Sequence, residues 1–153
     1  LYGATSGKLF AAGLAGDRFA VRNSGATTVI EGCDSNGCEY MTGGTVIILG
    51  EVGDNFAAGM TGGMAFIYDK HKESEKKINP DSVVWQSVET DYWINFLMKL
   101  VKEHSEETGS EISKKIVNNF TEEVKNFVQV CPKEMLDKIE NPISLKSKIK
   151  QVS

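Results

Sequence analysis

The chain has 153 residues, of which 41% are hydrophobic, 25% charged and 8% aromatic, and this composition excludes a disordered or fibrous protein. Its formal net charge of −4 argues against a nucleic acid or an anionic membrane as the main partner, and no apolar run is long enough to span a bilayer. Three cysteines and the absence of a signal segment at Leu1 fit a reducing compartment, so we expect a cytoplasmic protein.

Glycine and charge divide the chain into two parts. Fourteen of the 15 glycines fall at or before Gly63, and only Gly109 lies beyond it. Up to Tyr68 there are only 3 of the 17 basic residues and 6 of the 21 acidic ones. We therefore expect two architectures that meet near Asp69.

The glycines of the first part recur at a regular interval. Pairs that combine a small residue with glycine return at steps of 18, 19 and 19 residues, and further glycines keep the same phase between them. These pairs are Ser6-Gly7, Ser24-Gly25, Gly43-Gly44 and Gly62-Gly63. A short apolar stretch follows each pair, and a period of this size indicates a solenoid in which every turn packs on its neighbours.

Residues 1–69 are predicted to form a parallel β-solenoid of roughly three and a half turns. A helical solenoid is excluded because each interior glycine would cost about 1 kcal/mol in a helix. Glycine would occupy corners that need positive φ or have no room for a Cβ atom. The predicted structural glycines are Gly7, Gly13, Gly16, Gly25, Gly32, Gly37, Gly44, Gly50, Gly53 and Gly63. The side chains predicted to stack inside the coil are Leu9, Phe19, Val29, Ile30, Tyr40, Val46, Ile48 and Phe56.

The remainder of the chain is predicted to be helical. Residues 70–90 form a charged linker in this interpretation, and residues 91–140 form an α-helical cap or tail that covers the far end of the coil. The first helix should begin near Asp91 and stop before Gly109, because its apolar residues recur at steps of three and four.

A second helix should follow, with apolar residues on one face from Ile112 to Val128, and it should end before Pro132. Pro132 could open a short third helix to about Glu140. Residues 141–153 are predicted to be a frayed tail.

The spacing of the glycines excludes nucleotide-binding loops. No two glycines are separated by a single residue, so the G-x-G-x-x-G fingerprint of dinucleotide-binding domains is absent. Gly7-Lys8 is followed by Leu9 and lies only four residues after Gly3, so the spacing of a P-loop fails as well.

The cysteines and histidines form no recognisable catalytic pattern. Cys33 and Cys38 are separated by four residues and Cys131 lies far away, so we expect buried or idle thiols, with iron–sulfur ligands as the alternative. His71 and His104 are expected to be solvated or to cap helices.

Two arginines precede the second turn of the coil. Arg18 and Arg22 are expected to form salt bridges between turns with Asp17 and Asp54, and a substrate clamp is the alternative. The sequence therefore predicts no catalytic, cofactor-binding or metal-binding residue in this chain.

Several long sequence segments resemble the C-terminal β-helix domain, or GXGXG domain, of glutamate synthase large subunits. They are GATSGK (3–8), AGDRFAVRNSGA (15–26), GCEYMTGG (37–44) and NFAAGMTGG (55–63). His104, Thr108-Gly109-Ser110, Phe127-Val128, Val130 and Pro132 resemble the helical tail of that family. The resemblance extends to about residue 140 and implies a mainly β protein with an α tail, a single-stranded right-handed parallel β-helix followed by two or three helices.

The resemblance also implies a function for the parent protein. Glutamate synthases form two glutamates from glutamine, 2-oxoglutarate and reducing equivalents. An amidotransferase domain and an FMN-binding synthase domain with a 3Fe–4S cluster are joined by an ammonia tunnel. None of these catalytic elements matches this chain, so the resemblance implies a non-catalytic structural domain with no activity of its own.

The implied partners are the amidotransferase and FMN domains and a small reductase subunit, in the cytoplasm or, for a plant-type enzyme, in a plastid. The coil would begin in register at residue 1 with an open edge, and we expect another part of the protein to cover it. The expected role is a stiff strut that fixes the spacing of the two catalytic domains. NADPH, NADH and ferredoxin all remain open as electron donors.

Two other classes of β-helix protein are weighed as alternatives. One is an assembly subunit of another oxidoreductase, such as formylmethanofuran dehydrogenase. The other is a left-handed β-helix acyltransferase, which needs a six-residue repeat. Gly7 and Gly13 are six residues apart, but the steps from Gly16 to Gly25 and from Gly25 to Gly32 break that repeat.

Overall fold

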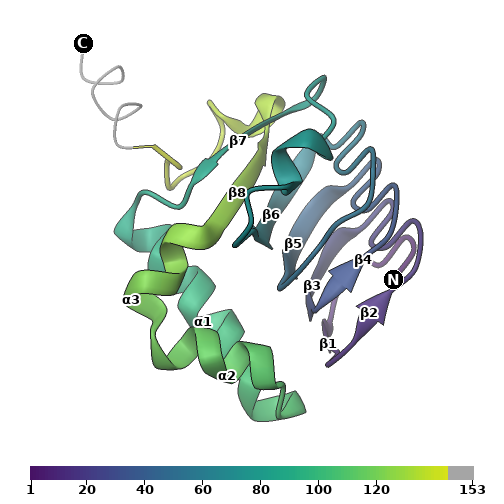
Figure 1. Ribbon diagram of the computed structural model, residues 1–153. Coiled ribbons are helices and arrows are strands. Elements are labelled where there is room, and N and C mark those ends of the chain that lie inside the picture. The colour runs from purple at the N-terminus through teal and green to yellow at the C-terminus, as the bar shows by residue number, and fades with distance from the viewer. Residues whose placement is uncertain (145–153) are drawn as a thin grey trace.

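The first part of the chain winds into a β-solenoid in which each turn contributes one strand to a shared sheet (Figure 1). The computed structural model describes residues 1–144. The successive strands are β1 (Lys8–Phe10), β3 (Ser24–Ile30), β5 (Thr42–Ile48) and β6 (Gly62–Tyr68), and each pairs in parallel with the next. Two short strands, β2 (Leu14–Ala15) and β4 (Gly32–Cys33), pair on another wall of the coil. The predicted β-solenoid is confirmed.

The register of the first two turns differs by one residue from the predicted repeat. Lys8 lies opposite Thr27, and the Thr27 N–H donates to the Gly7 carbonyl at 2.9 Å. A first step of 18 residues would have placed Lys8 opposite Ala26. The next steps are 18 residues from Thr27 to Thr45 and 19 from Thr45 to Met64, so the residue before the paired segment is Ala26 in this turn and Gly7, Gly44 or Gly63 in the others.

Alternate residues of each strand face opposite sides of the sheet and build two cores. The coil core lies inside the solenoid and includes the ladder Ile30, Ile48 and Ile67. The helix-side core lies on the outer face and includes the ladder Phe10, Val29, Ile47 and Phe66. The same strands therefore hold both the coil and the helices in place.

Three of the side chains predicted to stack inside the coil are not part of the coil core. Val29 belongs to the helix-side core, because neighbouring residues of a strand cannot face the same side. Leu9 is 39% exposed on the first turn, and Tyr40 is 55% exposed in a turn with positive φ. The prediction is confirmed for Phe19, Ile30, Val46, Ile48 and Phe56, which belong to the coil core.

In a further wall of the coil, every second residue has a positive φ. Backbone hydrogen bonds join this wall from one turn to the next. The Arg22 N–H donates to the Glu39 carbonyl at 2.9 Å, and the Tyr40 N–H donates to the Ala58 carbonyl at 2.8 Å. The non-glycine residues with positive φ in this wall are Arg18, Ala20, Arg22, Asn36, Cys38, Tyr40, Asn55 and Ala57. The middle member of each group, Ala20, Cys38 or Ala57, is small and buried because it faces the coil core.

The turns approach each other most closely at one glycine in each of three successive turns. A Cβ atom on Gly25, Gly43 or Gly62 would lie 2.1, 2.2 or 1.9 Å from a backbone carbonyl oxygen of the preceding turn. No side chain can move to relieve such an overlap, because both atoms belong to the backbone. These glycines therefore set the distance between turns.

Two antiparallel strands, which lie far apart in the sequence, extend the sheet beyond β6. The strand β8 (Phe127–Pro132) pairs antiparallel with β6 and with β7 (Val83–Ser87), which gives the sheet order β1-β3-β5-β6-β8-β7. The strand β7 lies within the segment read as a linker, and β8 replaces the predicted end of the second helix. The alternation of β8, with Val130 in the coil core and Phe127 and Cys131 in the helix-side core, suits a strand.

The helices cover the outer face of the sheet rather than an end of the coil (Figure 1). The first, α1 (Asp91–Thr108), has the predicted limits and ends at Gly109 with φ +67°. The helical segment that follows is shorter than predicted and consists of α2 (Glu111–Asn118), α3 (Phe120–Glu123) and the 3-10 helix η2 (Val124–Asn126). Two further 3-10 helices are η1 (Ser74–Lys76) and η3 (Lys133–Met135).

The segment after η3 is anchored as far as it is described. The Trp93 indole donates to the Asn141 carbonyl at 2.9 Å, and the Gln86 amide donates to the Ile143 carbonyl at 2.6 Å. The predicted frayed tail does not include these residues, and its remainder, 145–153, lies outside the described residues. Within residues 1–144, no helix combines the length and the apolar character that crossing a membrane requires.

We expect Gly62→Ala to destabilise the chain by about 3 kcal/mol or more, because its Cβ atom would overlap the Thr42 carbonyl oxygen at 1.9 Å. The matched control is Gly16→Ala, whose Cβ atom would have no heavy atom within 4 Å and whose φ is not positive. Urea unfolding of both variants measures the difference. Equal midpoints for the two variants would show that the close approach does not hold the turns together.

Candidate functional site at the junction of the coil and the helices

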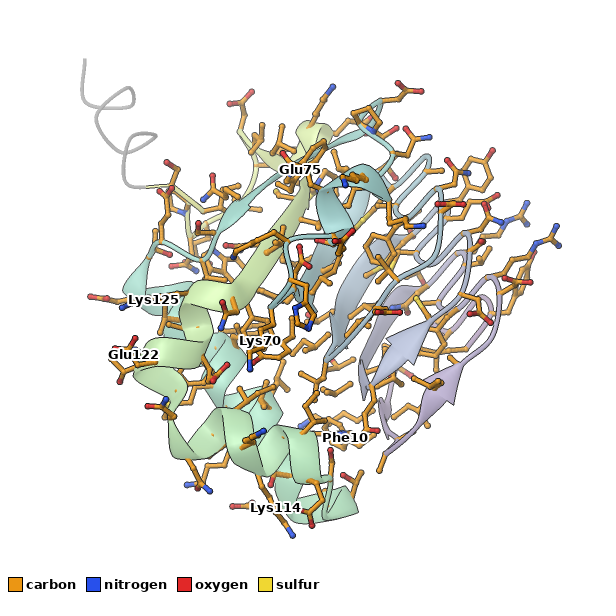
Figure 2. The ribbon with its side chains drawn as sticks, viewed as in Figure 1. Phe10, Lys70, Glu75, Lys114, Glu122 and Lys125 are labelled. Carbon is orange, nitrogen blue, oxygen red and sulfur yellow. The ribbon has the colours of Figure 1, made fainter. Side chains whose placement is uncertain are left out.

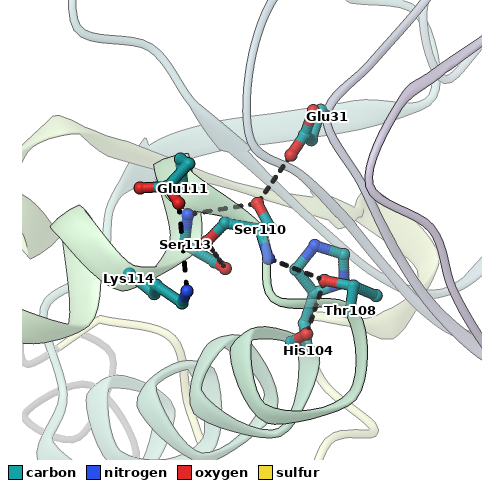
Figure 3. A network of polar contacts seen from close by, with 7 residues as sticks. All are labelled: Glu31, His104, Thr108, Ser110, Glu111, Ser113 and Lys114. Atoms are coloured by element: carbon teal, nitrogen blue, oxygen red, sulfur yellow. Dashed lines mark hydrogen bonds and ion pairs between the residues drawn. The ribbon is translucent and has the colours of Figure 1, made fainter.

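The turn between α1 and α2 rests on the corner of the coil that follows β3 (Figure 3). Ser110 is the N-cap of α2, and its hydroxyl oxygen accepts from the Ser113 N–H at 3.4 Å. The same hydroxyl donates to the carboxylate of Glu31 at 2.6 Å, across 79 residues of sequence. One serine therefore caps the helix and ties it to the coil.

The charges at this junction suit the helix that they face. The Glu31 carboxylate lies at the N-terminus of α2, where the partial positive charge of the helix favours an anion. A second tie joins Lys8 of β1 to Glu103 of α1 at 2.9 Å. Because the Lys8 side chain is exposed, this ion pair contributes little to stability.

His104 lies beneath this turn and is fully buried. The edge of its ring meets Phe10 of β1, with the ring centroids 5.9 Å apart. Burial lowers the pKa of the imidazole, and the nearby Glu31 charge opposes that shift. The expectation that His104 is solvated or caps a helix is wrong, because its helix packs directly onto the coil.

A groove of about 660 Å³ continues from the junction along the coil. It lies between the corner after β5, the segment that follows β6, and α2, and Lys70 lies between these layers in Figure 2. Its lining includes Glu51, Tyr68, Asp69, Lys70, His71 and Ile112. The groove therefore brings several titratable side chains to one hollow of the surface.

The buried polar groups of the groove form hydrogen bonds within the chain. Asp69 accepts the Glu73 N–H at 2.9 Å and both the N–H and the hydroxyl of Ser74, at 3.1 and 2.5 Å. The Tyr68 hydroxyl donates to Glu123, and burial together with that carboxylate raises its pKa to about 12. His71 is exposed, and no described nucleophile is hydrogen-bonded to it. The groove therefore shows no arrangement for nucleophilic or acid–base catalysis among the residues described.

The three thiols are buried on opposite sides of the sheet, two in one core and one in the other, and do not fit an iron–sulfur cluster. Cys33 and Cys38 lie in the coil core, and Cys131 lies in the helix-side core. Burial raises the pKa of Cys33 to about 12 and that of Cys131 to about 11, and it raises the pKa of Cys38 strongly. Cluster ligands must be thiolates, and the part of the chain described here holds no group of three metal-ligating side chains.

The predicted salt bridges of the two arginines are not formed. Asp54 instead pairs with Lys77 at 2.9 Å, and Asp17 accepts the Ser35 N–H at 3.0 Å. Arg18 and Arg22 point outward from the wall of positive φ and take part in none of the ion pairs within residues 1–144. The clamp alternative gains no support either, since neither arginine lines either of the two cavities described among residues 1–144.

Sequence reasoning missed two contacts that join distant segments. The first is the Glu31–Ser110 bond, for which Ser110 before a helical pattern offered only a capping signal. The second is an amide ladder, in which Asn79 donates to Asn55 at 2.8 Å and Asn55 donates to Asn36 at 3.0 Å. The repeat does place Asn36 and Asn55 at one position of successive turns, so the period could have revealed half of the ladder.

Comparison with known proteins gives a consistent match. The family model described as "GXGXG motif" matches residues 1–133. The chain is 58% identical over 145 residues to the glutamate synthase [NADPH] large chain of Azospirillum brasilense, covering 95% of this chain and 10% of that protein. It is 46% identical over 152 residues to the glutamate synthase [NADH] of Schizosaccharomyces pombe, covering 99% of this chain and 7% of that protein.

A third relative is the ferredoxin-dependent glutamate synthase 1, chloroplastic/mitochondrial, of Arabidopsis thaliana, with 47% identity over 132 residues, 86% of this chain and 8% of that protein. The chain thus spans a tenth or less of the length of these relatives. These matches favour glutamate synthase over the assembly subunit and the acyltransferase that the sequence left as alternatives.

We expect Ser110→Ala to cost about 1–2 kcal/mol, since it removes both the cap of α2 and the bond to Glu31. Glu31→Gln should cost less, because its amide oxygen can still accept from Ser110. Urea unfolding of both variants tests the ranking. A Ser110→Ala variant as stable as the wild type would contradict it.

The thiols should be unreactive in the folded chain. At about pH 7.5 we expect no reaction of Cys33, Cys38 or Cys131 with an aromatic disulfide reagent, because their raised pKa values leave almost no thiolate. All three should react after addition of guanidinium chloride. Rapid reaction of any of them in the native chain would contradict the burial described above.

Proposed function

This chain belongs to the GXGXG motif family, and from that premise we propose that it is the non-catalytic structural domain of a glutamate synthase. The parent enzyme would convert glutamine, 2-oxoglutarate and reducing equivalents into two glutamates. The proposal rests on the match over residues 1–133 and on relatives that are glutamate synthases in bacteria, yeast and plants.

The domain would act mechanically in that enzyme. One observation carries this part of the proposal: the described residues form a continuous coil whose turns touch backbone to backbone, while their titratable groups hold structure and form no catalytic arrangement. A coil of this kind resists bending and stretching because every turn is bonded to its neighbours. It can therefore hold two catalytic domains at a fixed spacing, so that ammonia passes between them without loss to water.

FMN and the 3Fe–4S cluster would lie in other domains of the parent enzyme, and the three buried cysteines of this chain do not fit a cluster. The partners would be the amidotransferase domain, the FMN domain and a small reductase subunit. The relatives carry the words NADPH, NADH and ferredoxin in their names, so the fold serves enzymes with different electron donors. The location would follow the parent enzyme, in the cytoplasm or in a plastid.

The test uses a full-length parent enzyme that contains this chain. Gly62→Ala should weaken the coil, whereas Gly16→Ala should not. We expect Gly62→Ala to raise the ratio of glutamine hydrolysed to glutamate formed at least severalfold, with the FMN content unchanged and Gly16→Ala at the wild-type ratio. Deletion of residues 1–144 should uncouple the two activities completely or prevent folding.

The result that would overturn the scaffold role is wild-type coupling in an enzyme whose coil has been shown to be unfolded. Circular dichroism of the isolated Gly62→Ala chain and limited proteolysis of the full-length variant report on the state of the coil. Glutaminase or synthase activity in this chain alone would equally refute a non-catalytic domain.

A further inference from the structure

The ring of His104 is a titratable group that is buried without hydrogen-bond partners among residues 1–144. It lies in the last full turn of α1 and is fully buried, with its edge against Phe10. Neither Nδ1 nor Nε2 has a hydrogen-bond partner among residues 1–144. Burial without partners destabilises a neutral imidazole, and it destabilises a charged imidazolium much more.

The hydroxyl groups near the ring are already committed to other bonds (Figure 3). The Thr108 hydroxyl donates to the backbone carbonyl of His104 at 2.8 Å and accepts the Ser110 N–H at 3.2 Å. The Ser110 hydroxyl donates to Glu31 at 2.6 Å. The Thr108 and Ser110 hydroxyl groups are thus engaged in the bonds that define the turn, and neither ring nitrogen of His104 is bonded to them.

The charges around the ring come from each element packed on it. Glu31, at the corner after β3, favours a charged ring, but this effect is smaller than that of burial, and one of its carboxylate oxygens accepts from Ser110. Lys8 of β1 and Glu103 of α1 neutralise each other at 2.9 Å. On α2, Glu111 and Lys114 form an exposed pair at 3.9 Å (Figure 3). The ring is thus surrounded by one carboxylate, whose effect is outweighed by burial, and by two pairs of opposite charges.

We propose that His104 is a proton-sensitive latch: its neutral ring helps to hold the turn between α1 and α2 on the coil, and its protonation weakens this docking and favours opening of the helices. Release would uncover the outer ladder of Phe10, Val29, Ile47 and Phe66, an apolar strip that runs across four turns. The latch follows from the packing alone and does not depend on the assignment to glutamate synthase.

The direction of the pH effect follows from linkage. The pKa of His104 is lowered from its ordinary 6.5 in the docked state and returns to that value when the helices are released. Docking is therefore most stable above pH 6.5 and weakens as the pH falls from 6.5 toward the lowered pKa. One proton taken up on release raises the opening equilibrium up to about tenfold between pH 7.5 and 5.5.

Hydrogen exchange of the α1 and α2 amides, corrected for intrinsic rates, measures this opening at pH 7.5 and 5.5. We expect up to a tenfold rise in opening for the wild type and no rise for His104→Phe, which keeps an aromatic edge against Phe10 but cannot be protonated. The matched control is His71→Phe, since His71 is exposed and distant in sequence, and it should retain the full pH response. An apolar fluorescent dye should bind the wild type more strongly at pH 5.5 as the outer ladder becomes exposed.

An unchanged pH response in His104→Phe overturns the proposal. Should that variant fail to fold, a nuclear magnetic resonance titration of the wild-type imidazoles decides the question. The proposal requires that the His104 ring stay neutral for as long as the helices are docked. A ring that becomes charged near pH 6.5 with the α2 amides still protected overturns it.

Discussion

The structure depends on the close contact between the backbones of successive turns. At Gly25, Gly43 and Gly62, a carbonyl oxygen of the preceding turn occupies the place that a Cβ atom would take. This contact fixes the spacing of β1, β3, β5 and β6, and that spacing allows their N–H and carbonyl groups to pair in one parallel ladder. Everything else in the fold is positioned by this ladder, because its strands carry side chains on both faces.

The two cores are coupled through that ladder. Ile30 and Ile48 fill the coil, whereas Val29 and Ile47 of the same strands support the helices. A slip of one residue in register would exchange the two sets of side chains, so the coil cannot shift without displacing the helices. The contact between Ser110 and Glu31 adds a polar tie at the corner of the coil, where the N-terminus of α2 meets a carboxylate.

This coupling explains why a domain without catalytic groups can serve an enzyme. In the role we propose, the coil supplies stiffness, while the helices shield its apolar outer face from water. The two tasks require different chemistry: backbone bonding for the first, and side-chain packing with a neutral His104 for the second. A proton could therefore loosen the helices while the turns of the coil stay bonded.

The sequence by itself determined the coil and the limits of α1. The glycine pairs can be read from the sequence because a positive φ or the lack of a Cβ atom depends on the residue type at one position. The end of α1 can be read in the same way, from Gly109 with its positive φ. Tertiary structure alone decided that β8 is a strand. The apolar residues from Phe127 to Cys131 suit both the period of a helix and that of a strand, and pairing with the free edge of β6 makes them a strand. It also decided the burial of His104 and its place beside Glu31, because that contact joins segments that only the folding of the whole chain brings together.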